Sequence, residues 1–384
     1  MVSEDIVLEE DPNKPQGQAI AVSEVVYALW VTYSRQLHSA GMGVSRPDHP
    51  LASRPPSPPL QPVPIDNVPS PPPLTSSSTS QSSISRRDLS PAEPMEHPLP
   101  GSDQVKARKS ISDFVILESM GSGAYGDVKL ARYQSSKSSK VVIKYVVKRK
   151  ILVDTWTRDR RLGTVPLEIH VLDFLRRPGY KHANIVEMLD FFEDGDNYYI
   201  EMLPHGLPGM DLFDYIELRL NMTERECIAI FEQVVSAIYH LHEICGIVHR
   251  DVKDENVVLD GDNKVKLIDF GSAAYVKNGP FDVFVGTIDY AAPEVLRGEP
   301  YGGKEQDVWA LGILLYTMVF RENPFYNIDE ILDHPLRLPE LDRPYSTECI
   351  DLIQSMLNRD VEQRLTIAEV TDHPWFNLVG SNAL

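Results

Sequence analysis

The chain has 384 residues, of which 42% are hydrophobic and 24% are charged, and its formal net charge is −19. This hydrophobic fraction can fill at least one large core, so the composition excludes collagen-like, coiled-coil and wholly disordered chains. The acidic balance offers no basic excess for contacts with a phosphate backbone, so nucleic acid is not expected as the main ligand.

The first apolar stretch covers residues 19–33 and is interrupted by Ser23 and Glu24. It is too short to cross a bilayer and no basic segment precedes it, so we predict no membrane span. We interpret residues 19–35 as a short helix with its large apolar side chains on one side. Two interpretations stay open: a weakly populated amphipathic segment, or a helix that docks on the chain's own core or on a partner.

Residues 46–100 are dominated by proline and serine, and 18 of the 30 prolines lie at or before Pro100. Such a segment has too little apolar surface to offset the entropy of ordering, so residues 1–105 are expected to be mostly disordered with polyproline II character. Its serines that precede a proline are Ser57, Ser70 and Ser90, and PxxP spacing recurs near Pro55. These motifs suggest SH3, WW or phospho-dependent partners, and a featureless solvated linker is the alternative.

The composition beyond residue 105 is that of a globular domain, which we place at residues 106–380. Apolar runs bounded by turn residues predict strands at residues 114–117, 127–133, 140–147, 185–192 and 197–202. Helical periodicity predicts helices at residues 167–175, 212–219, 224–245, 307–320, 347–357 and 367–371. A β-rich part over about residues 111–203, followed by a larger helical part over about 206–380, predicts a two-lobed α+β fold.

A glycine-rich segment lies between the first two predicted strands and reads Gly121-Ser122-Gly123-Ala124-Tyr125-Gly126. The pattern G-x-G-x-x-G alone is weak evidence, because in dinucleotide-binding folds the same glycines open a helix. Between two strands, a glycine-rich hairpin lets backbone N–H groups approach phosphates without obstruction by side chains. The sequence contains no G-x-x-x-x-G-K-S/T motif, which excludes the P-loop class.

Five further motifs follow along the chain in a fixed order. They are Val141-Val-Ile-Lys144, His249-Arg-Asp251-Val-Lys253-Asp-Glu-Asn256, Asp269-Phe-Gly271, Gly286-Thr287 and Ala292-Pro-Glu294. Each is a weak signal alone, because a lysine that ends an apolar strand is usually a solvated edge. In this order and spacing they resemble eukaryotic protein kinases over roughly residues 111–376, which implies the bilobal protein kinase fold.

The resemblance implies phosphoryl transfer from ATP with Mg²⁺, in which the protein positions groups and neutralises charge. It implies that Lys144 holds the α- and β-phosphates and is oriented by a carboxylate, for which Glu168 is the candidate. It also implies that Asp269 and Asn256 bind the magnesium ions.

The acceptor side of the reaction is implied by the same motifs. Asp251 would accept the proton of the substrate hydroxyl, with Lys253 near the transferred phosphate. Lys253 and Thr287, the latter in Gly-Thr-x-x-Tyr, resemble Ser/Thr kinases rather than tyrosine kinases, so protein substrates with Ser or Thr acceptors are the expected partners. Glu255 and Asp211 lie where several basophilic kinases contact basic residues upstream of the acceptor, which suggests such a preference here.

The nucleotide pocket implied by the resemblance combines the glycine-rich hairpin, apolar side chains around the adenine, a gatekeeper at Met202, a hinge at Leu203 to His205 and a ribose contact at Asp211. The full set is Gly121, Ser122, Gly123, Ala124, Gly126, Val128, Val142, Lys144, Met202, Leu203, His205, Asp211, Val258 and Ile268. Asp307 is expected to brace the catalytic loop, and Glu294 is expected to form a buried ion pair with Arg364.

The alternative from another class is a pseudokinase or scaffold that uses the fold for binding. We do not favour it, because such proteins usually lack at least one catalytic residue, and the full set is present here.

Four segments point to one group of kinases: KYVVKRKILVDTWTRDRRLGTVPLE, HGLPGMDLFDYI, HRDVKDEN and LIDFGSAAY. They resemble the catalytic domain of PAS kinases, which are nutrient-responsive Ser/Thr kinases. In the first segment Glu168 follows Lys144 by 24 positions, which is longer than usual. The resemblance implies a role in nutrient or metabolic signalling, although the proline-rich first hundred residues cannot supply the PAS sensor.

A second departure concerns activation. Many kinases carry a phosphorylatable threonine four residues before the Gly-Thr threonine, where its phosphate pairs with the arginine of the catalytic loop. Val283 occupies that position here. We hypothesise that the loop is ordered without phosphorylation, with Asp282 supplying negative charge near Arg250.

The three cysteines, Cys227, Cys245 and Cys349, are odd in number and far apart in the sequence. This spacing argues against a disulfide framework and against a structural zinc site. We therefore expect a cytoplasmic protein, and the nucleus is the second compartment that the sequence leaves open.

Overall fold

The computed structural model describes residues 109–122, 126–152, 155–207, 209–219, 221–341 and 345–379. The predicted disordered segment 1–105 and helix 19–35 lie outside the described residues, as do Gly123 and Ala124 of the glycine-rich hairpin. In the part of the chain that is described, no helix is long and apolar enough to cross a membrane.

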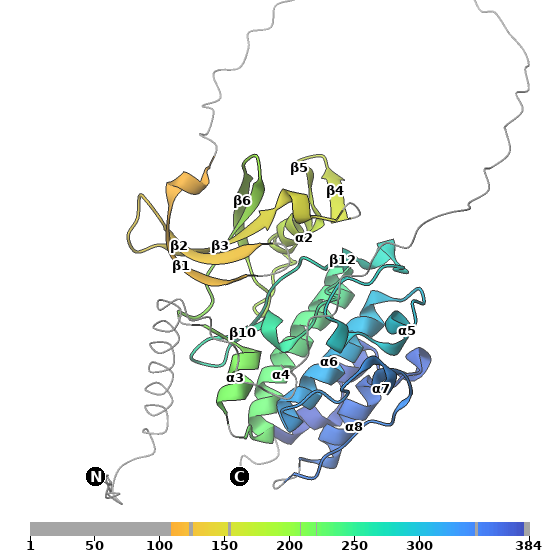
Figure 1. The fold of residues 1–384 in the computed structure, drawn as a ribbon. Helices are drawn as coiled ribbons and strands as arrows, with labels where there is room; N and C mark the ends of the chain where they lie inside the picture. Colours follow the sequence, from red (N-terminus) through yellow and green to blue (C-terminus); the bar gives the residue numbers. More distant parts are fainter. Residues whose placement is uncertain are drawn as a thin grey trace, which may run out of the picture. The chain divides into compact units, whose positions relative to one another are not determined.

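The first part of the described chain is built on an antiparallel sheet with the strand order β1-β2-β3-β7-β6 (Figure 1). Its strands are β1 (Phe114–Ser122), β2 (Asp127–Tyr133), β3 (Lys140–Val147), β6 (Met188–Glu193) and β7 (Asn197–Met202). One face buries an apolar cluster that includes Val141, Ile143 and Tyr199. Because side chains alternate along a strand, Val142 and Lys144 point to the opposite face of the same sheet.

One helix, α2 (Leu167–Leu175), covers this part of the molecule, and a hairpin of β4 (Trp156–Asp159) and β5 (Gly163–Pro166) leads directly into it (Figure 1). The helix begins at its predicted residue and buries Ile169 and Leu172. The hairpin lies inside the long segment between Lys144 and Glu168, and the sequence did not predict it. Its four-residue strands are too short and too polar to show a clear period of two.

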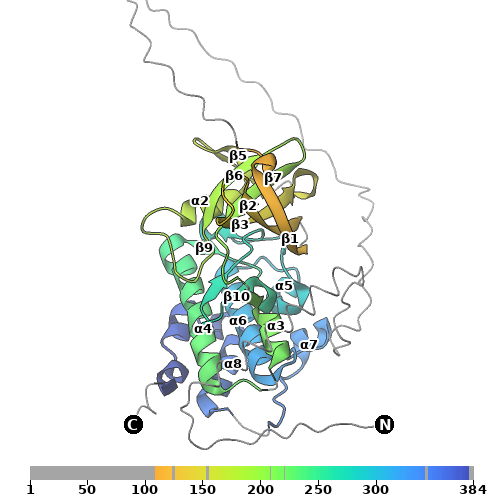
Figure 2. The same ribbon diagram turned by 90° about the vertical axis from the view of Figure 1, so that its left-hand side faces the viewer.

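The second part of the described chain is mainly helical, and Figure 2 shows it below the sheet. Its α-helices are α3 (Leu212–Leu218), α4 (Glu224–Tyr239), α5 (Pro293–Leu296), α6 (Gly303–Phe320), α7 (Ile328–Asp333), α8 (Thr347–Met356) and α9 (Ile367–Thr371). Helix α6 is buried nearly all round, as a central core helix should be. Helix α4 begins at a capping box formed by Thr223 and Glu226.

The predicted helix at residues 224–245 is not one regular helix. Helix α4 ends at Tyr239 and continues as the π-helical turn η4 (His240–Cys245), which stops at Gly246 with a φ of 64°. This left-handed backbone favours glycine and ends the helix. Apart from such local differences, the structure confirms the predicted two-lobed α+β fold.

Short strands frame the loops that carry the predicted catalytic motifs. One sheet is formed by β8 (Met210–Asp211), β10 (Val257–Leu259) and β11 (Val265–Leu267), and another by β9 (Ile247–Val248) and β12 (Ala274–Tyr275). Strand β9 ends directly before His249, β10 begins directly after Asn256, and β11 ends two residues before Asp269. These pairings fix the ends of both loops.

Candidate active site

Three charged side chains from separate elements meet between the sheet and the helical part. Lys144 Nζ lies 2.7 Å from Oε1 of Glu168 and 2.7 Å from Oδ1 of Asp269. Lys144 comes from β3, Glu168 from the first turn of α2, and Asp269 from the loop after β11. The Lys144 and Glu168 side chains are only 9% and 6% exposed, whereas that of Asp269 is 36% exposed. The group is therefore closed on the α2 side and open on the side of Asp269.

The charges of this group follow from burial and from each other. Burial lowers the pKa of Lys144, but the carboxylates of Glu168 and Asp269 outweigh it, so its pKa lies above the ordinary value. Burial raises the pKa of Asp269, but the charge and the hydrogen bond of Lys144 outweigh burial, so the pKa of Asp269 lies below its ordinary value. Burial raises the pKa of Glu168. Asp269 is thus held as a carboxylate, the form that binds a cation.

A second group of predicted residues surrounds Asp251. Thr287 Oγ1 donates a hydrogen bond to Oδ1 of Asp251 at 2.8 Å, and Asn256 Nδ2 lies 3.2 Å from Oδ2 of Asp251. Asn256 Nδ2 also donates to the backbone oxygen of Asp251 at 2.8 Å. Lys253 forms an ion pair with Glu255 at 2.8 Å. Burial lowers the pKa of Lys253, but the nearby carboxylates, Asp251 first and then Glu255, outweigh burial, so its pKa is raised. Both carboxylate oxygens of Asp251 therefore have fixed directions.

The backbone of this loop is held by the fully buried Asp307 of α6. Its carboxylate accepts the backbone N–H groups of His249 at 2.8 Å and Arg250 at 2.7 Å, and it lies 2.8 Å from Nε2 of His242. Arg250 has a φ of 63°, an uncommon value for a residue with a side chain. The predicted brace at Asp307 is thus present as three contacts to the loop and to η4.

The predicted ion pair of Glu294 and Arg364 is also present. Arg364 donates to both oxygens of Glu294, at 2.7 and 2.9 Å, and both side chains are almost fully buried. This bidentate geometry is the arrangement in which guanidinium and carboxylate bind most strongly.

The side chain of Arg250 lies over an aromatic ring. Its Nε donates to the backbone oxygen of Ser272 at 2.7 Å, and its guanidinium carbon lies 4.4 Å from the centre of the Phe281 ring. Phe281 is held in turn by two backbone hydrogen bonds with Tyr301, at 2.9 and 3.0 Å. Asp282 is exposed. Among the described contacts it is Phe281 that covers Arg250, so the role that we hypothesised for Asp282 has no supporting contact.

Strand pairing places the predicted nucleotide-binding residues on a few neighbouring elements. In the sheet, Val128 pairs with Lys144 and Val142 pairs with Met202. Strand β1 ends at Gly121 and Ser122. A Cβ atom at position 126 would lie 2.0 Å from the backbone oxygen of Tyr145, so position 126 requires glycine. The hairpin backbone therefore packs directly on β3, beside Lys144.

The remaining pocket residues lie after the predicted hinge, where Val258 of β10 pairs with Asp211 of β8. The backbone N–H of Ile268 donates a hydrogen bond to the backbone oxygen of Asn256 at 2.9 Å. Leu203 is 48% exposed. The His205 ring nitrogen Nε2 lies 2.7 Å from the backbone oxygen of Lys264, which fixes the end of the hinge.

Asp211 has an unusual electrostatic environment. Its carboxylate accepts the backbone N–H of Asp214 at 2.8 Å and so caps α3. Burial raises its pKa to about 7, although the hydrogen bond from Asp214 acts in the opposite direction. This carboxylate therefore titrates near neutral pH.

Several structural partners of the site were not predicted from the sequence. The hydroxyl oxygen of Tyr275 lies 2.8 Å from Nδ1 of His170, and Asp173 forms ion pairs with Arg161, Arg176 and Arg177. The only signal in the sequence was the unusual length of the segment that carries Arg161. Arg161 and Asp173 are 12 positions apart and Tyr275 and His170 are 105 apart, so helical periodicity could not reveal these two contacts.

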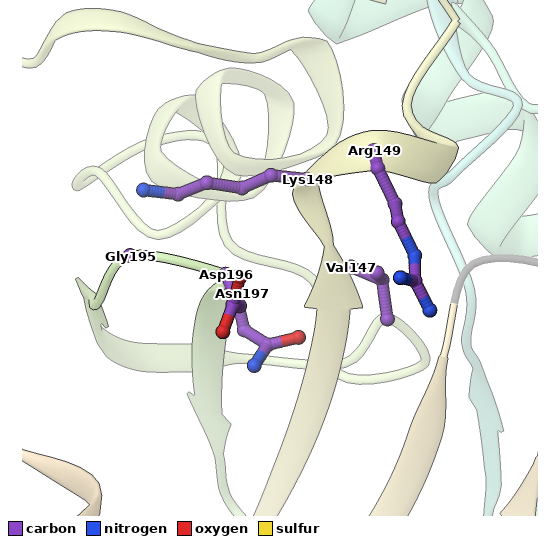
Figure 3. Close-up of a pocket in the computed structure, with 6 residues that line it drawn as sticks. All are labelled: Val147, Lys148, Arg149, Gly195, Asp196 and Asn197. Atoms are coloured by element: carbon purple, nitrogen blue, oxygen red, sulfur yellow. The ribbon is translucent and has the colours of Figure 1, made fainter.

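A hollow of about 400 Å³ lies at the end of β3, away from these residues. Figure 3 shows its lining, Val147, Lys148, Arg149, Gly195, Asp196 and Asn197, with the side chains of Lys148 and Arg149 diverging. Lys148 Nζ donates hydrogen bonds to the Glu193 carboxylate and to the backbone oxygen of Asp194. None of the predicted catalytic or nucleotide-binding residues lines this hollow, so it is separate from the candidate site.

Comparison with known proteins extends the resemblance along most of the described chain. The protein kinase domain family matches residues 114–376. The serine/threonine-protein kinase PSK1 of Saccharomyces cerevisiae is 58% identical over 268 residues, which cover 70% of this chain and 19% of that protein. The serine/threonine-protein kinase ppk6 of Schizosaccharomyces pombe is 54% identical over 269 residues, or 70% of this chain and 34% of that protein.

A mouse protein connects the chain to the group suggested by its sequence. The PAS domain-containing serine/threonine-protein kinase of Mus musculus is 43% identical over 257 residues, which cover 67% of this chain and 18% of that protein. The match to these three relatives spans between about a fifth and a third of their length. The predicted resemblance to PAS kinases is confirmed. The chain belongs to the protein kinase domain family.

Proposed function

We propose that this chain is a protein Ser/Thr kinase, which transfers the γ-phosphoryl group of ATP to Ser and Thr hydroxyls of protein substrates. The observation that carries the proposal is the contact of one buried lysine, Lys144, with both Glu168 and Asp269 at 2.7 Å. In this family the paired lysine and glutamate and the metal-binding aspartate must be in place together for phosphoryl transfer.

In the proposed reaction the substrate hydroxyl oxygen attacks the γ-phosphorus, the bond from this phosphorus to the bridging oxygen breaks, and ADP leaves. The hydroxyl proton passes to Asp251, and hydrogen bonds from Thr287 and Asn256 support this role because they fix the orientation of the carboxylate. Lys144 would contact the α- and β-phosphates, and Lys253 would lie near the transferred group. The proposed domain covers residues 106–380, and the pocket residues keep the roles that the sequence predicts.

Magnesium fits the donor atoms that these residues present. Mg²⁺ is typically bound by one or two carboxylates together with substrate phosphates and waters. Asp269 offers an ionised and partly exposed carboxylate, and Asn256 offers an amide oxygen, since its Nδ2 faces Asp251. When bound, Mg²⁺ would neutralise charge that develops on the phosphates.

The finer features of the function remain parts of this proposal. Glu255 and Asp211 would favour basic residues upstream of the acceptor. From the resemblance of its motifs to PAS kinases, we infer a role in nutrient or metabolic signalling, and we propose the cytoplasm as its compartment, with the nucleus as the second. The proline-rich segment 1–105 would recruit SH3, WW or phospho-dependent partners.

A direct experiment is to incubate the purified full chain with Mg-ATP and peptide libraries that carry Ser, Thr or Tyr acceptors. Mass spectrometry would compare the wild type with Asp251→Asn, and with Asp262→Asn at an exposed aspartate as the control. We expect phosphate on Ser and Thr peptides for the wild type and the control only. Equal incorporation by Asp251→Asn would contradict the proposal. Binding of ATP without transfer by the wild type would favour the pseudokinase alternative.

A further inference from the structure

The segment between Lys144 and Glu168 is longer than usual, and the proposed reaction assigns it no role. Part of it forms the β4–β5 hairpin, in which Trp156 pairs with Pro166 and Asp159 pairs with Gly163. Pro166 is also the residue that caps α2, so the hairpin ends where the helix that carries Glu168 begins. The hairpin is therefore directly continuous with this end of α2.

The hairpin is a defined structure. Oδ1 of Asp159 accepts the backbone N–H groups of Arg161 and Leu162 at 2.7 and 2.8 Å, which closes the turn. The ring of Trp156 meets that of Tyr198 edge to face, with centroids 6.0 Å apart, and the Tyr198 hydroxyl donates to the backbone oxygen of Thr164 at 3.3 Å. The hairpin is thus fixed to β7 of the main sheet.

Two charged residues of the hairpin turn contact α2. Arg161 forms an ion pair with Asp173, whose carboxylate is only 1% exposed. Asp173 also pairs with Arg176 at 2.7 Å and Arg177 at 3.1 Å, so its charge stays compensated when Arg161 is replaced. The other oxygen of Asp159, Oδ2, lies 3.5 Å from Nε2 of His170. These contacts hold α2 from the side of the hairpin.

The opposite nitrogen of the same histidine connects α2 to the segment that follows Asp269. Nδ1 of His170 lies at hydrogen-bond distance, 2.8 Å, from the Tyr275 hydroxyl oxygen. Tyr275 lies in β12, where it pairs with Ile247 of β9, directly before the catalytic loop. One imidazole therefore joins the hairpin, α2 and the β9–β12 pair.

We propose that the β4–β5 hairpin is a built-in positioning device, in which Arg161 and the series Asp159, His170 and Tyr275 hold α2 so that Glu168 reaches Lys144. This proposal rests on the proposed kinase function. The four residues are positioning residues, because they act through Glu168 and need not touch the substrate. Their contribution is to keep Lys144 aligned with the nucleotide phosphates.

The test replaces single contacts that should leave the fold intact. Arg161→Gln removes the guanidinium from an exposed turn, and Tyr275→Phe removes one hydroxyl but keeps the ring. Arg160→Gln, an exposed arginine of the same turn, is the matched control. For each full-length variant we would measure the dissociation constant of a non-hydrolysable ATP analogue with Mg²⁺, and KM for ATP and for peptide.

For Arg161→Gln and Tyr275→Phe we expect about a three- to tenfold weaker affinity for the analogue and a matching rise in KM for ATP, with KM for peptide unchanged. Arg161→Lys should restore part of the affinity. In a Glu168→Gln background, Arg161→Gln should add less than about twofold, since both act through one carboxylate. A merely structural loss would lower kcat in proportion to the folded fraction and leave both KM values unchanged.

The proposal is overturned if both variants bind the analogue within about twofold of Arg160→Gln, or if Arg161→Gln has its full effect in the Glu168→Gln background. The binding measurement does not depend on catalysis. A wild type that binds the analogue but transfers no phosphate would contradict the proposed function. The dissociation constants of the variants for the analogue would still decide the role of the hairpin.

Discussion

Asp211 gives a quantitative test of the electrostatics of the candidate site. Burial raises its pKa to about 7 from an ordinary value of 3.8. Between these two values the folded chain binds more protons at Asp211 than the unfolded chain, so this residue makes stability fall as pH rises. The decrease is complete well above pH 7, where the partly buried carboxylate is ionised in the folded chain. Asp211→Asn removes the charge, and asparagine can still cap α3.

The expected magnitude follows from the two pKa values. A difference of about 3 units corresponds to about 4 kcal/mol of destabilisation by the ionised carboxylate above pH 7. At pH 5 less than half of this destabilisation is present, because the carboxyl of the folded chain is still mostly protonated. The stabilisation of Asp211→Asn over the wild type should therefore be about 3 kcal/mol greater at pH 8 than at pH 5.

Thermal unfolding of both proteins at pH 5 and pH 8, without nucleotide, measures this difference. For a domain of this size we expect the gain in Tm to be larger at pH 8 by roughly 6 °C or more. Asp262→Asn, at an exposed aspartate, controls for the change in net charge and should show no such dependence. A gain for Asp211→Asn that is the same at both pH values would refute a raised pKa for the partly buried carboxyl of Asp211.

Three further predictions address other contacts. Lys144→Met leaves two carboxylates facing each other, and we expect kcat to fall by about 100-fold or more in initial-rate assays. Glu294→Gln leaves the buried Arg364 without its counter-charge and should lower the free energy of unfolding by about 3–5 kcal/mol in denaturant titrations; a loss below about 1 kcal/mol would contradict this. Phe281→Leu removes the ring over Arg250 and should lower kcat with little change in Tm; unchanged kinetics would show that this contact does not order the segment.

The sequence was sufficient where regular patterns or short motifs carry the structure. Helical periodicity predicted the bounds of α2, and apolar runs between turn residues predicted those of β2 and β3. The resemblance to protein kinases implied that Lys144, Glu168 and Asp269 belong to one site, and the structure brings these side chains together.

The sequence was insufficient where distant contacts decide the structure. The β4–β5 hairpin depends on Trp156 against Tyr198 and on Arg161 against Asp173, and neither pair has a local signature. Two-residue strands such as β9 and β12 are too short for any periodicity. The contact of Phe281 with Arg250 depends on the backbone pairing of Phe281 with Tyr301, which lies twenty positions further along the chain.

The most direct test of the proposed activity is the initial rate at which label from γ-labelled ATP is transferred to a serine peptide, for the wild type and for Asp251→Asn under the same Mg²⁺ concentration. Asp251 is proposed to take the proton of the attacking hydroxyl, and such a group contributes about 10²–10⁴-fold to a rate. The account predicts steady transfer by the wild type and a loss of this size in the variant. A variant that transfers phosphate within about twofold of the wild-type rate would contradict it.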